Sequence, residues 1–133
     1  NWQHLHWTAI ESAYQSSPFF EFYQEDLRPF FEPQKFKYLY DFNIELQNTI
    51  CNLLDIKPQV EFSKEYMQAQ AGDVDLRELI HPKRPTIEEE KLLPYYQVFS
   101  ARHGFIPDLS IIDLLFNMGP ESIFLLLDTP KEK

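Results

Sequence analysis

The segment Ile111–Met118, IIDLLFNM, restricts the fold of this chain more than any other, because it predicts a helix that is apolar on nearly every side. Ser110 stands in front of it as a capping residue, and Gly119 is typical of a helix end. Pro120 can then restart a last helix, Glu121–Leu127. A helix that is hydrophobic all round must be covered all round, so the other elements have to pack about this one.

Three further segments predict helices that can provide this cover. Trp2–Gln15 has apolar residues at three- and four-residue spacing. A second helix is expected from Ser17, as its cap, to about Arg28, and Pro29 then kinks or restarts it. Tyr38–Leu54 is the clearest helix, with an apolar stripe opposite a polar face.

Two short segments predict strands. Val60–Phe62 alternates with polar neighbours, and Tyr95–Phe99 is extended by propensity. Short helices are expected over Val74–Ile80 and from the capping-box spacing at Thr86, within a polar stretch that reads as a surface loop or lid. We therefore expect residues 1–133 to form a single domain of the α+β class, predominantly α-helical, with a bundle-like core and one or two short strands.

The balance of charge is acidic, with 21 Asp and Glu against 12 Lys and Arg and a formal net charge of −9. A negative surface repels phosphate backbones and anionic lipids, so we expect no nucleic acid partner and no membrane insertion. No apolar run approaches the length of a membrane span. Cys51 is the only cysteine, which excludes an intrachain disulfide and fits a reducing cytoplasm.

Aromatic side chains are unusually abundant. The 12 Phe and 7 Tyr exceed what a small core readily hides. Some of them should face a ligand or partner, because aromatic residues dominate interface energetics. We therefore expect a homodimer, an exposed apolar patch, or a cover supplied by an N-terminal segment that this chain lacks.

The sequence contains no recognisable nucleophile, nucleotide loop or metal centre. GxSxG, the P-loop and GxGxxG are absent, and the chain has only 3 glycines. One cysteine cannot build a structural zinc site, and His4 and His6 point apart if their segment is helical. We therefore expect no cofactor and no metal.

The dipeptide Arg102-His103 is the best candidate for a functional site. Arginine offers a fork of donors that matches carboxylate or phosphate, and a histidine side chain can exchange a proton near neutral pH. Tyr96 and Gln97 lie just upstream and add a hydroxyl and an amide. We assign His103 and Tyr96 as candidate catalytic groups, and Arg102 and Gln97 as substrate-binding. The alternative is an exposed histidine beside an arginine that pairs with a neighbouring acid.

Asp108 and Asp113 differ from the other carboxylates because their neighbours are apolar. Asp108 is assigned to substrate binding, although it can equally fix the turn after Pro107. Asp113 follows Ser110 at the spacing of a capping box, so a helix cap is the first interpretation and a catalytic role the second.

Four stretches resemble the WbqC-like family. They are NWQHLHWTAIESAY at residues 1–14, SPFFEFY at 17–23, YYQVF at 95–99 and GFIPDLSIIDLLFNMGPES at 104–122. The resemblance covers nearly all of this chain but only the C-terminal part of a typical member. Members usually begin with a segment that carries Gln-Pro…Tyr-Phe and Asn-Tyr…Asn-Arg motifs, and neither motif is present here.

The resemblance implies a bacterial protein. Some members are encoded among genes for surface polysaccharides such as O-antigen and lipopolysaccharide, which implies a cytoplasmic transferase that adds an amino-acid or acyl group to an activated sugar. The expected partner is then an anionic small molecule such as a sugar nucleotide. The resemblance supplies no catalytic residues, and a non-catalytic protein-interaction module with an aromatic-rich surface is the alternative.

Overall fold

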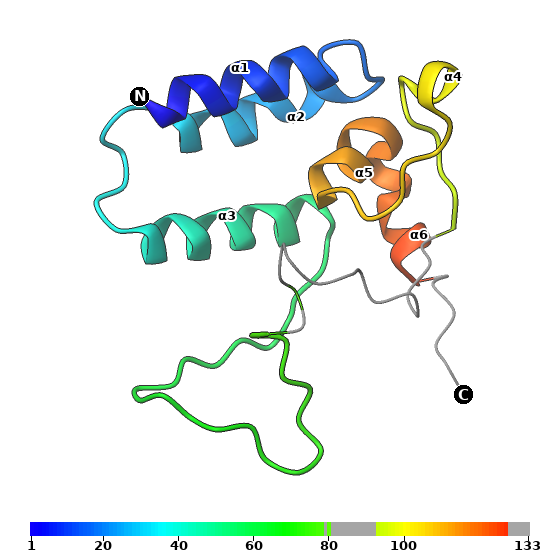
Figure 1. Ribbon diagram of the computed structural model, residues 1–133. Helices are drawn as coiled ribbons and strands as arrows, with labels where there is room; N and C mark the ends of the chain where they lie inside the picture. Colours follow the sequence, from blue (N-terminus) through cyan, green and yellow to red (C-terminus); the bar gives the residue numbers. More distant parts are fainter. Residues whose placement is uncertain (79, 81–92, 128–133) are drawn as a thin grey trace.

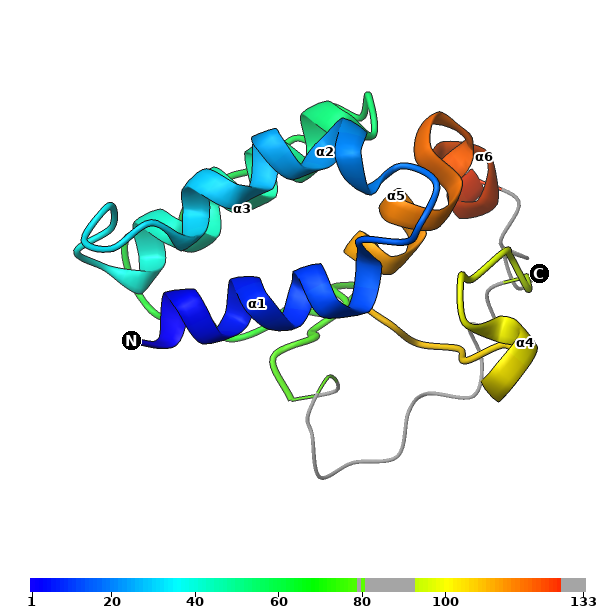
Figure 2. The ribbon, with the colours of Figure 1, turned by 90° about the horizontal axis from the view of Figure 1, so that it is seen from above.

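The computed structural model describes residues 1–78, 80 and 93–127, and every regular element in these ranges is a helix or a 3-10 turn (Figure 1). In chain order these are α1 (Trp2–Tyr14), α2 (Phe20–Leu27), η1 (Arg28–Phe31), α3 (Leu39–Leu53), α4 (Ser100–His103), α5 (Ile111–Met118), η2 (Gly119–Glu121) and α6 (Ser122–Leu127). The helices α1, α2 and α3 lie roughly parallel or antiparallel to one another, and α4, α5 and α6 gather at one end of them (Figures 1 and 2).

The first two helices form an antiparallel pair (Figure 2). α1 is capped by Asn1, whose Oδ1 accepts a hydrogen bond from the backbone N–H of His4 at 3.5 Å. α2 begins at Phe20, later than predicted, because Ser17 does not cap it. The Ser17 hydroxyl instead donates to the carbonyl of Tyr14 at 2.6 Å and so closes the end of α1. Pro29 restarts the chain as the 3-10 turn η1.

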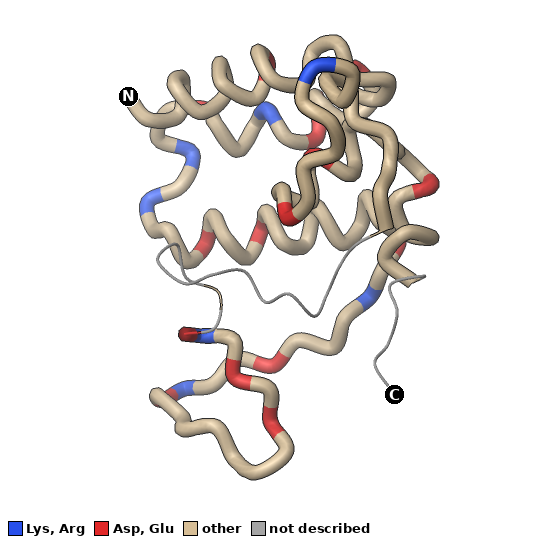
Figure 3. The backbone as a smooth tube through the Cα atoms, turned by 45° about the vertical axis from the view of Figure 1, so that its right-hand side comes forward, with Lys and Arg blue, Asp and Glu red and all other residues tan. Residues whose placement is uncertain are grey.

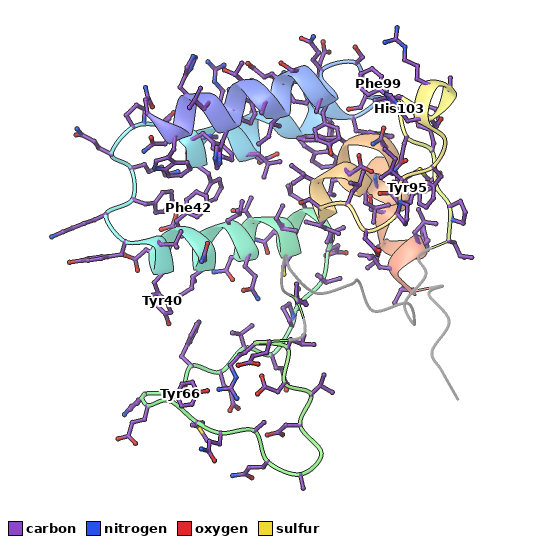
Figure 4. The ribbon with its side chains drawn as sticks, in the orientation of Figure 1. Tyr40, Phe42, Tyr66, Tyr95, Phe99 and His103 are labelled. Atoms are coloured by element: carbon purple, nitrogen blue, oxygen red, sulfur yellow. The ribbon has the colours of Figure 1, made fainter. Side chains whose placement is uncertain are left out.

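α3 is amphipathic as predicted, but none of its own residues is fully buried. Its Phe42 ring points toward α1 and α2, whereas Tyr40 points away from them (Figure 4). The indole of Trp2 meets the rings of Phe31 and Phe42, at centroid distances of 6.4 and 5.8 Å, and Trp7 meets Phe31 at 5.6 Å. Aromatic rings therefore fill the space between α1 and α3.

α5 forms the centre of the core, with the bounds that the sequence predicts. Its Leu114, Leu115 and Phe116 are each 2% exposed or less. The backbone N–H of Phe19 donates to the carbonyl of Phe116 at 2.9 Å, which fixes the α1–α2 connection against α5. Helix packing in this protein is thus organised about α5, as an all-round apolar helix requires.

Gly119 ends α5 and lies close against the ring of Phe19. Its φ is 57°, and a Cβ atom built there would lie 2.5 Å from the ring of Phe19. Only glycine has both the backbone freedom and the missing side chain that this approach needs.

The expectation of an α+β fold is wrong for the part of the chain that the structure describes, because that part contains no strand. Val60–Phe62 is irregular and exposed, and Tyr95–Phe99 leads irregularly into α4. A strand is stabilised by backbone pairing with a neighbouring strand, and neither segment has one. The backbone N–H of Val98 bonds instead to a side chain, Asn117 Oδ1, at 2.9 Å.

Residues 57–78 form an irregular segment that extends beyond α3, and all of its side chains are exposed (Figure 1). The helix predicted over Val74–Ile80 does not form in the described residues 74–78. Asp75 Oδ1 accepts from the backbone N–H of Arg77 at 3.1 Å, and Asp73 Oδ2 accepts from that of Gln70 at 2.8 Å. Such local side-chain bonds compete with helical ones. The helix predicted from Thr86 lies outside the described residues.

Charged residues are spread along the helices and along the 57–78 segment (Figure 3). In residues 93–127, Arg102 is the only Lys or Arg, and it lies on α4. None of the described helices combines the length and the apolar character needed to cross a membrane.

Candidate functional site

Five polar side chains from three parts of the chain meet beneath α4. They are Tyr14, Tyr95, Gln97, Asp113 and Asn117, which we call the Asp113 cluster. Gln97, Asp113 and Asn117 are only 5%, 4% and 3% exposed. Burying polar groups is costly unless each one finds hydrogen-bond partners.

The carboxylate of Asp113 is the centre of the cluster. Tyr95 Oη donates to its Oδ2 at 2.6 Å, and Gln97 Nε2 donates to the same atom at 3.0 Å. Asn117 Nδ2 lies 3.3 Å from Oδ1. The structure therefore corrects the first interpretation of Asp113 as a helix cap: Ser110 is the N-cap of α5, and the Asp113 carboxylate binds side chains instead.

Gln97 clamps the two ends of a loop together. Its Oε1 accepts from the backbone N–H of Ile106 at 2.9 Å, and its Nε2 donates to the carbonyl of Ile106 at 2.8 Å. The side chain of Gln97 thereby pairs with Ile106 as a backbone amide would. The loop between them carries α4, and the Asn117 bond to Val98 fixes its first residue.

The two tyrosines of the cluster hold their protons tightly. Burial raises the pKa of Tyr95, and its hydrogen bond to Asp113 raises it further. Burial also raises the pKa of Tyr14, and the neighbouring Asp113 carboxylate acts in the same direction. Both hydroxyls are therefore donors near neutral pH, and the cluster acts as a set of fixed hydrogen bonds that supports the loop above it.

The structure separates the predicted site residues into a buried one and exposed ones. Gln97 is buried, and its amide is used by the internal bonds described above. Tyr96 is 53% exposed, and Arg102 and His103 are exposed on α4. Asp108 is exposed and has a φ of 56°, which places it in a turn, where aspartate tolerates this conformation.

Arg102 and His103 are brought together on one helical turn, but they are not locked to other side chains. Among the described residues, neither of them makes a side-chain hydrogen bond or an ion pair with another described residue, and the same holds for Tyr96. Their assignment to substrate binding and proton transfer stays a prediction.

Two hollows formed by described residues lie away from α4. One, of about 490 Å³, is lined by residues between Met67 and Arg77. The other, of about 420 Å³, lies between α1 and α2 beside Glu11 and Glu21. No group of three His, Cys, Asp or Glu side chains within the described ranges is arranged to hold a metal ion.

Sequence reasoning missed Tyr14 and Asn117 as members of the cluster. Tyr14 ends an amphipathic helix and looks like an ordinary core residue. Asn117 follows Asp113 by four residues, which places both on one face of a helix. Two polar residues at that spacing in an otherwise apolar helix are a signal of a buried polar contact.

Comparison with known proteins identifies a family but no reaction. The family model described as WbqC-like protein family matches residues 1–82, which is more than half of the chain. The Asp113 cluster is formed mainly by residues beyond that range. The Mycobacterium tuberculosis protein named "Uncharacterized protein Rv1507c" is 26% identical over 145 aligned positions, which cover 92% of this chain.

This chain spans only 63% of the length of that mycobacterial relative. No solved structure matches the chain. Because the family model covers most of the sequence, the chain belongs to the WbqC-like protein family.

Proposed function

We propose that the protein acts in the biosynthesis of a bacterial surface polysaccharide of the O-antigen type, and that it binds an anionic, activated sugar at α4. The family membership supports the cellular setting, since the resemblance implies genes for surface polysaccharides. The reaction that fits this setting is transfer of an amino-acid or acyl group to the sugar. The proposal places the protein in the cytoplasm, where sugar nucleotides are made.

The observation that carries this proposal is that the Arg102 side chain is exposed and has no acidic partner among the described residues. Arg102 is also the only Lys or Arg of residues 93–127. Arg77, by contrast, forms an ion pair with Asp75. An arginine left without an internal partner on a fixed turn is available to an external anion.

In this proposal each site residue has a role that follows from its position. Arg102 holds the phosphate or carboxylate of the ligand, and His103, next to it on α4, is placed to transfer a proton together with Tyr96. Asp108 accepts hydrogen bonds from sugar hydroxyl groups. Gln97 does not contact the ligand in this proposal. It supports the site, because its amide holds Ile106 at the far end of the loop that carries α4.

The test is a thermal-shift titration with a panel of nucleotide-activated hexoses. Replacing Arg102 by Lys keeps the charge but removes the fork, so binding should weaken by at least about tenfold. Arg77→Lys is the matched control, because Arg77 is also exposed but already has an internal partner. If no sugar nucleotide shifts the melting temperature, or if both variants behave alike, the proposal fails.

A second candidate function, a non-catalytic protein-interaction module, is favoured by a different observation. Many large apolar side chains are exposed, among them Leu5 at 67%, Phe22 at 68%, Leu39 at 71% and Tyr66 at 82%. Surfaces of this kind mark interaction sites when the residues adjoin one another. The partner is then a second copy of the chain or another protein.

Sedimentation velocity over a range of concentrations tests the homodimer form of this candidate. Self-association that weakens in a Phe62→Ser, Tyr66→Ser double variant, but not in a Glu65→Ser control, would support it. All three residues lie in the exposed 57–78 segment, so their replacement should leave the core intact. A monomer at every concentration would exclude self-association through this surface.

A further inference from the structure

Phe99 is a large aromatic side chain in an unusual position. It precedes α4 directly, is 42% exposed, and stacks on no other described aromatic ring, whereas the nearby Tyr95 ring packs against Phe105 at 5.2 Å. Because 42% of the side chain is exposed, a large part of the apolar surface of the ring remains in contact with water. Phe99 lies next to Arg102 and His103, the exposed residues of α4.

Phe99, Arg102 and His103 share one turn of the backbone. The N–H groups of Arg102 and His103 both donate to the carbonyl of Phe99, at 3.0 and 3.2 Å. Residues three and four apart lie on the same side of a helical turn. Figure 4 shows Phe99 and His103 close together at α4, apart from the tyrosine of the buried cluster beneath.

The geometry points to a binding subsite for a nucleoside diphosphate, with the base on the Phe99 ring and the phosphates on Arg102 and His103. This inference rests on the anion site proposed above and names its substrate class. A flat exposed ring offers a stacking surface to any base, and stacking of this kind tolerates different bases. Guanidinium and imidazole groups donate hydrogen bonds to phosphate oxygens.

The backbone of this turn is already fixed in the absence of a ligand. The N–H of Gly104 donates to the carbonyl of Ser100 at 2.8 Å and closes the turn. Gln97 holds Ile106, and Asn117 holds Val98, at the two ends of the loop. A ligand therefore does not have to order the loop on binding, which lowers the entropic cost of association.

The charge of the molecule distinguishes a single nucleotide from a polymer. A formal net charge of −9 repels the extended phosphate backbone of RNA or DNA over many positions. A diphosphate needs only one local contact, and Arg102 supplies the one Lys or Arg side chain of residues 93–127. The subsite thus fits a free nucleotide or the nucleotide part of an activated sugar.

Isothermal titration calorimetry with UDP and with inorganic pyrophosphate tests this inference. The unaltered protein should bind UDP at least about fivefold more tightly than pyrophosphate, the low end of the gain from stacking one base. Phe99→Leu should remove this difference and leave pyrophosphate affinity unchanged. Phe99→Trp should retain the difference, and Phe22→Leu, at an exposed aromatic residue of α2, should not change it.

The outcomes separate the two proposals. Equal affinity for UDP and pyrophosphate in the unaltered protein overturns the nucleoside subsite, even if Phe99→Leu does not fold. If pyrophosphate binding still depends on Arg102, the anion site stands without it. If neither compound binds, both proposals fail. A UDP preference that persists in a folded Phe99→Leu variant places the base elsewhere and overturns the role of Phe99.

Discussion

The core around α5 and the 57–78 segment contain the same kinds of residues in opposite surroundings. Phe116 in α5 is 0% exposed, and Tyr66 in the segment is 82% exposed. Asp113 in the core accepts bonds from Tyr95 and Gln97 and is 4% exposed. Asp75 in the segment forms its ion pair with Arg77 at the surface.

The comparison shows that burial, and not residue type, decides how much a contact contributes to the free energy of unfolding of this protein. Water competes for the Asp75–Arg77 pair and for the Tyr66 ring, so both contribute little to the free energy of unfolding. The side chains of Gln97, Asp113 and Asn117 are 3–5% exposed, so a lost partner there leaves a buried group unsatisfied.

Replacing Phe116 by Ala should have the largest effect. The ring is fully buried and packs on Tyr14 and Phe20, at centroid distances of 5.1 Å each. Its loss should lower the free energy of unfolding by about 3–5 kcal/mol in urea denaturation. The control Tyr66→Ala should change it by less than about 0.5 kcal/mol. Similar losses in the two variants would contradict the contrast.

Two of the three positive-φ glycines, Gly119 and Gly72, provide the next test. Gly119→Ala combines backbone strain with a collision on the Phe19 ring and should lower the free energy of unfolding by about 2–4 kcal/mol. Gly72 has a φ of 97° in the exposed segment with open space around it, so Gly72→Ala should show strain alone, about 1 kcal/mol. Chemical denaturation of both variants measures the difference. An equal loss of unfolding free energy in the two variants would mean that the Phe19 ring moves aside without cost.

Replacing Asp113 by Ala should lower the free energy of unfolding by about 1–3 kcal/mol, because Tyr95 Oη and Gln97 Nε2 lose a buried acceptor. The matched change Asp75→Ala should leave the melting temperature unaltered, since water replaces the lost partner. If Asp113→Ala is as stable as the unaltered protein but binds no ligand, Asp113 belongs to the site itself and not to its support.

Stability should also fall at alkaline pH because of the cluster. The pKa values of Tyr14 and Tyr95 are raised in the folded protein above their ordinary value of 10.0. The unfolded chain therefore loses these protons first, so stability declines as the pH rises above about 10 and is lost through the raised folded values. Denaturation between pH 8 and about 11.5 should show this slope, and a Tyr14→Phe, Tyr95→Phe double variant should flatten it. An unchanged slope would remove the two tyrosines as its cause.

The smallest effect is expected at Asp75. Its hydrogen bonds to Arg77 lower the pKa of Asp75 to about 2. A lowered carboxyl pKa adds stability above the unfolded value of 3.8 and loses it as the pH falls through the folded value, but water screens this exposed pair. NMR titration should show the low pKa, and Arg77→Gln should return it to the ordinary range without a change in melting temperature. A clear drop in melting temperature would show that the segment is held more firmly than its exposure indicates.

The sequence alone determined the helices with strong periodicity and clear ends. The bounds of α5 were predicted because Ser110 and Gly119 signal its ends and its composition demands burial. α1 and α3 follow from their apolar spacing for the same reason. It did not reveal that Arg102 and His103 lie on a helical turn, α4, which ends at Gly104. The WbqC-like resemblance was readable too, and the match over residues 1–82 confirms it.

Only the tertiary structure decided whether the short segments form strands and which partners the polar residues bind. The alternation at Val60–Phe62 is too brief to form a strand without a pairing partner, and no local rule reveals whether such a partner exists. The role of Asp113 depended on Tyr95 and Gln97, which lie 18 and 16 residues away in the sequence. Local spacing predicts bonds to the nearby backbone, whereas the fold brings distant donors within reach and shields them from water. That is why Asp113 anchors the loop under α4 and does not cap its own helix.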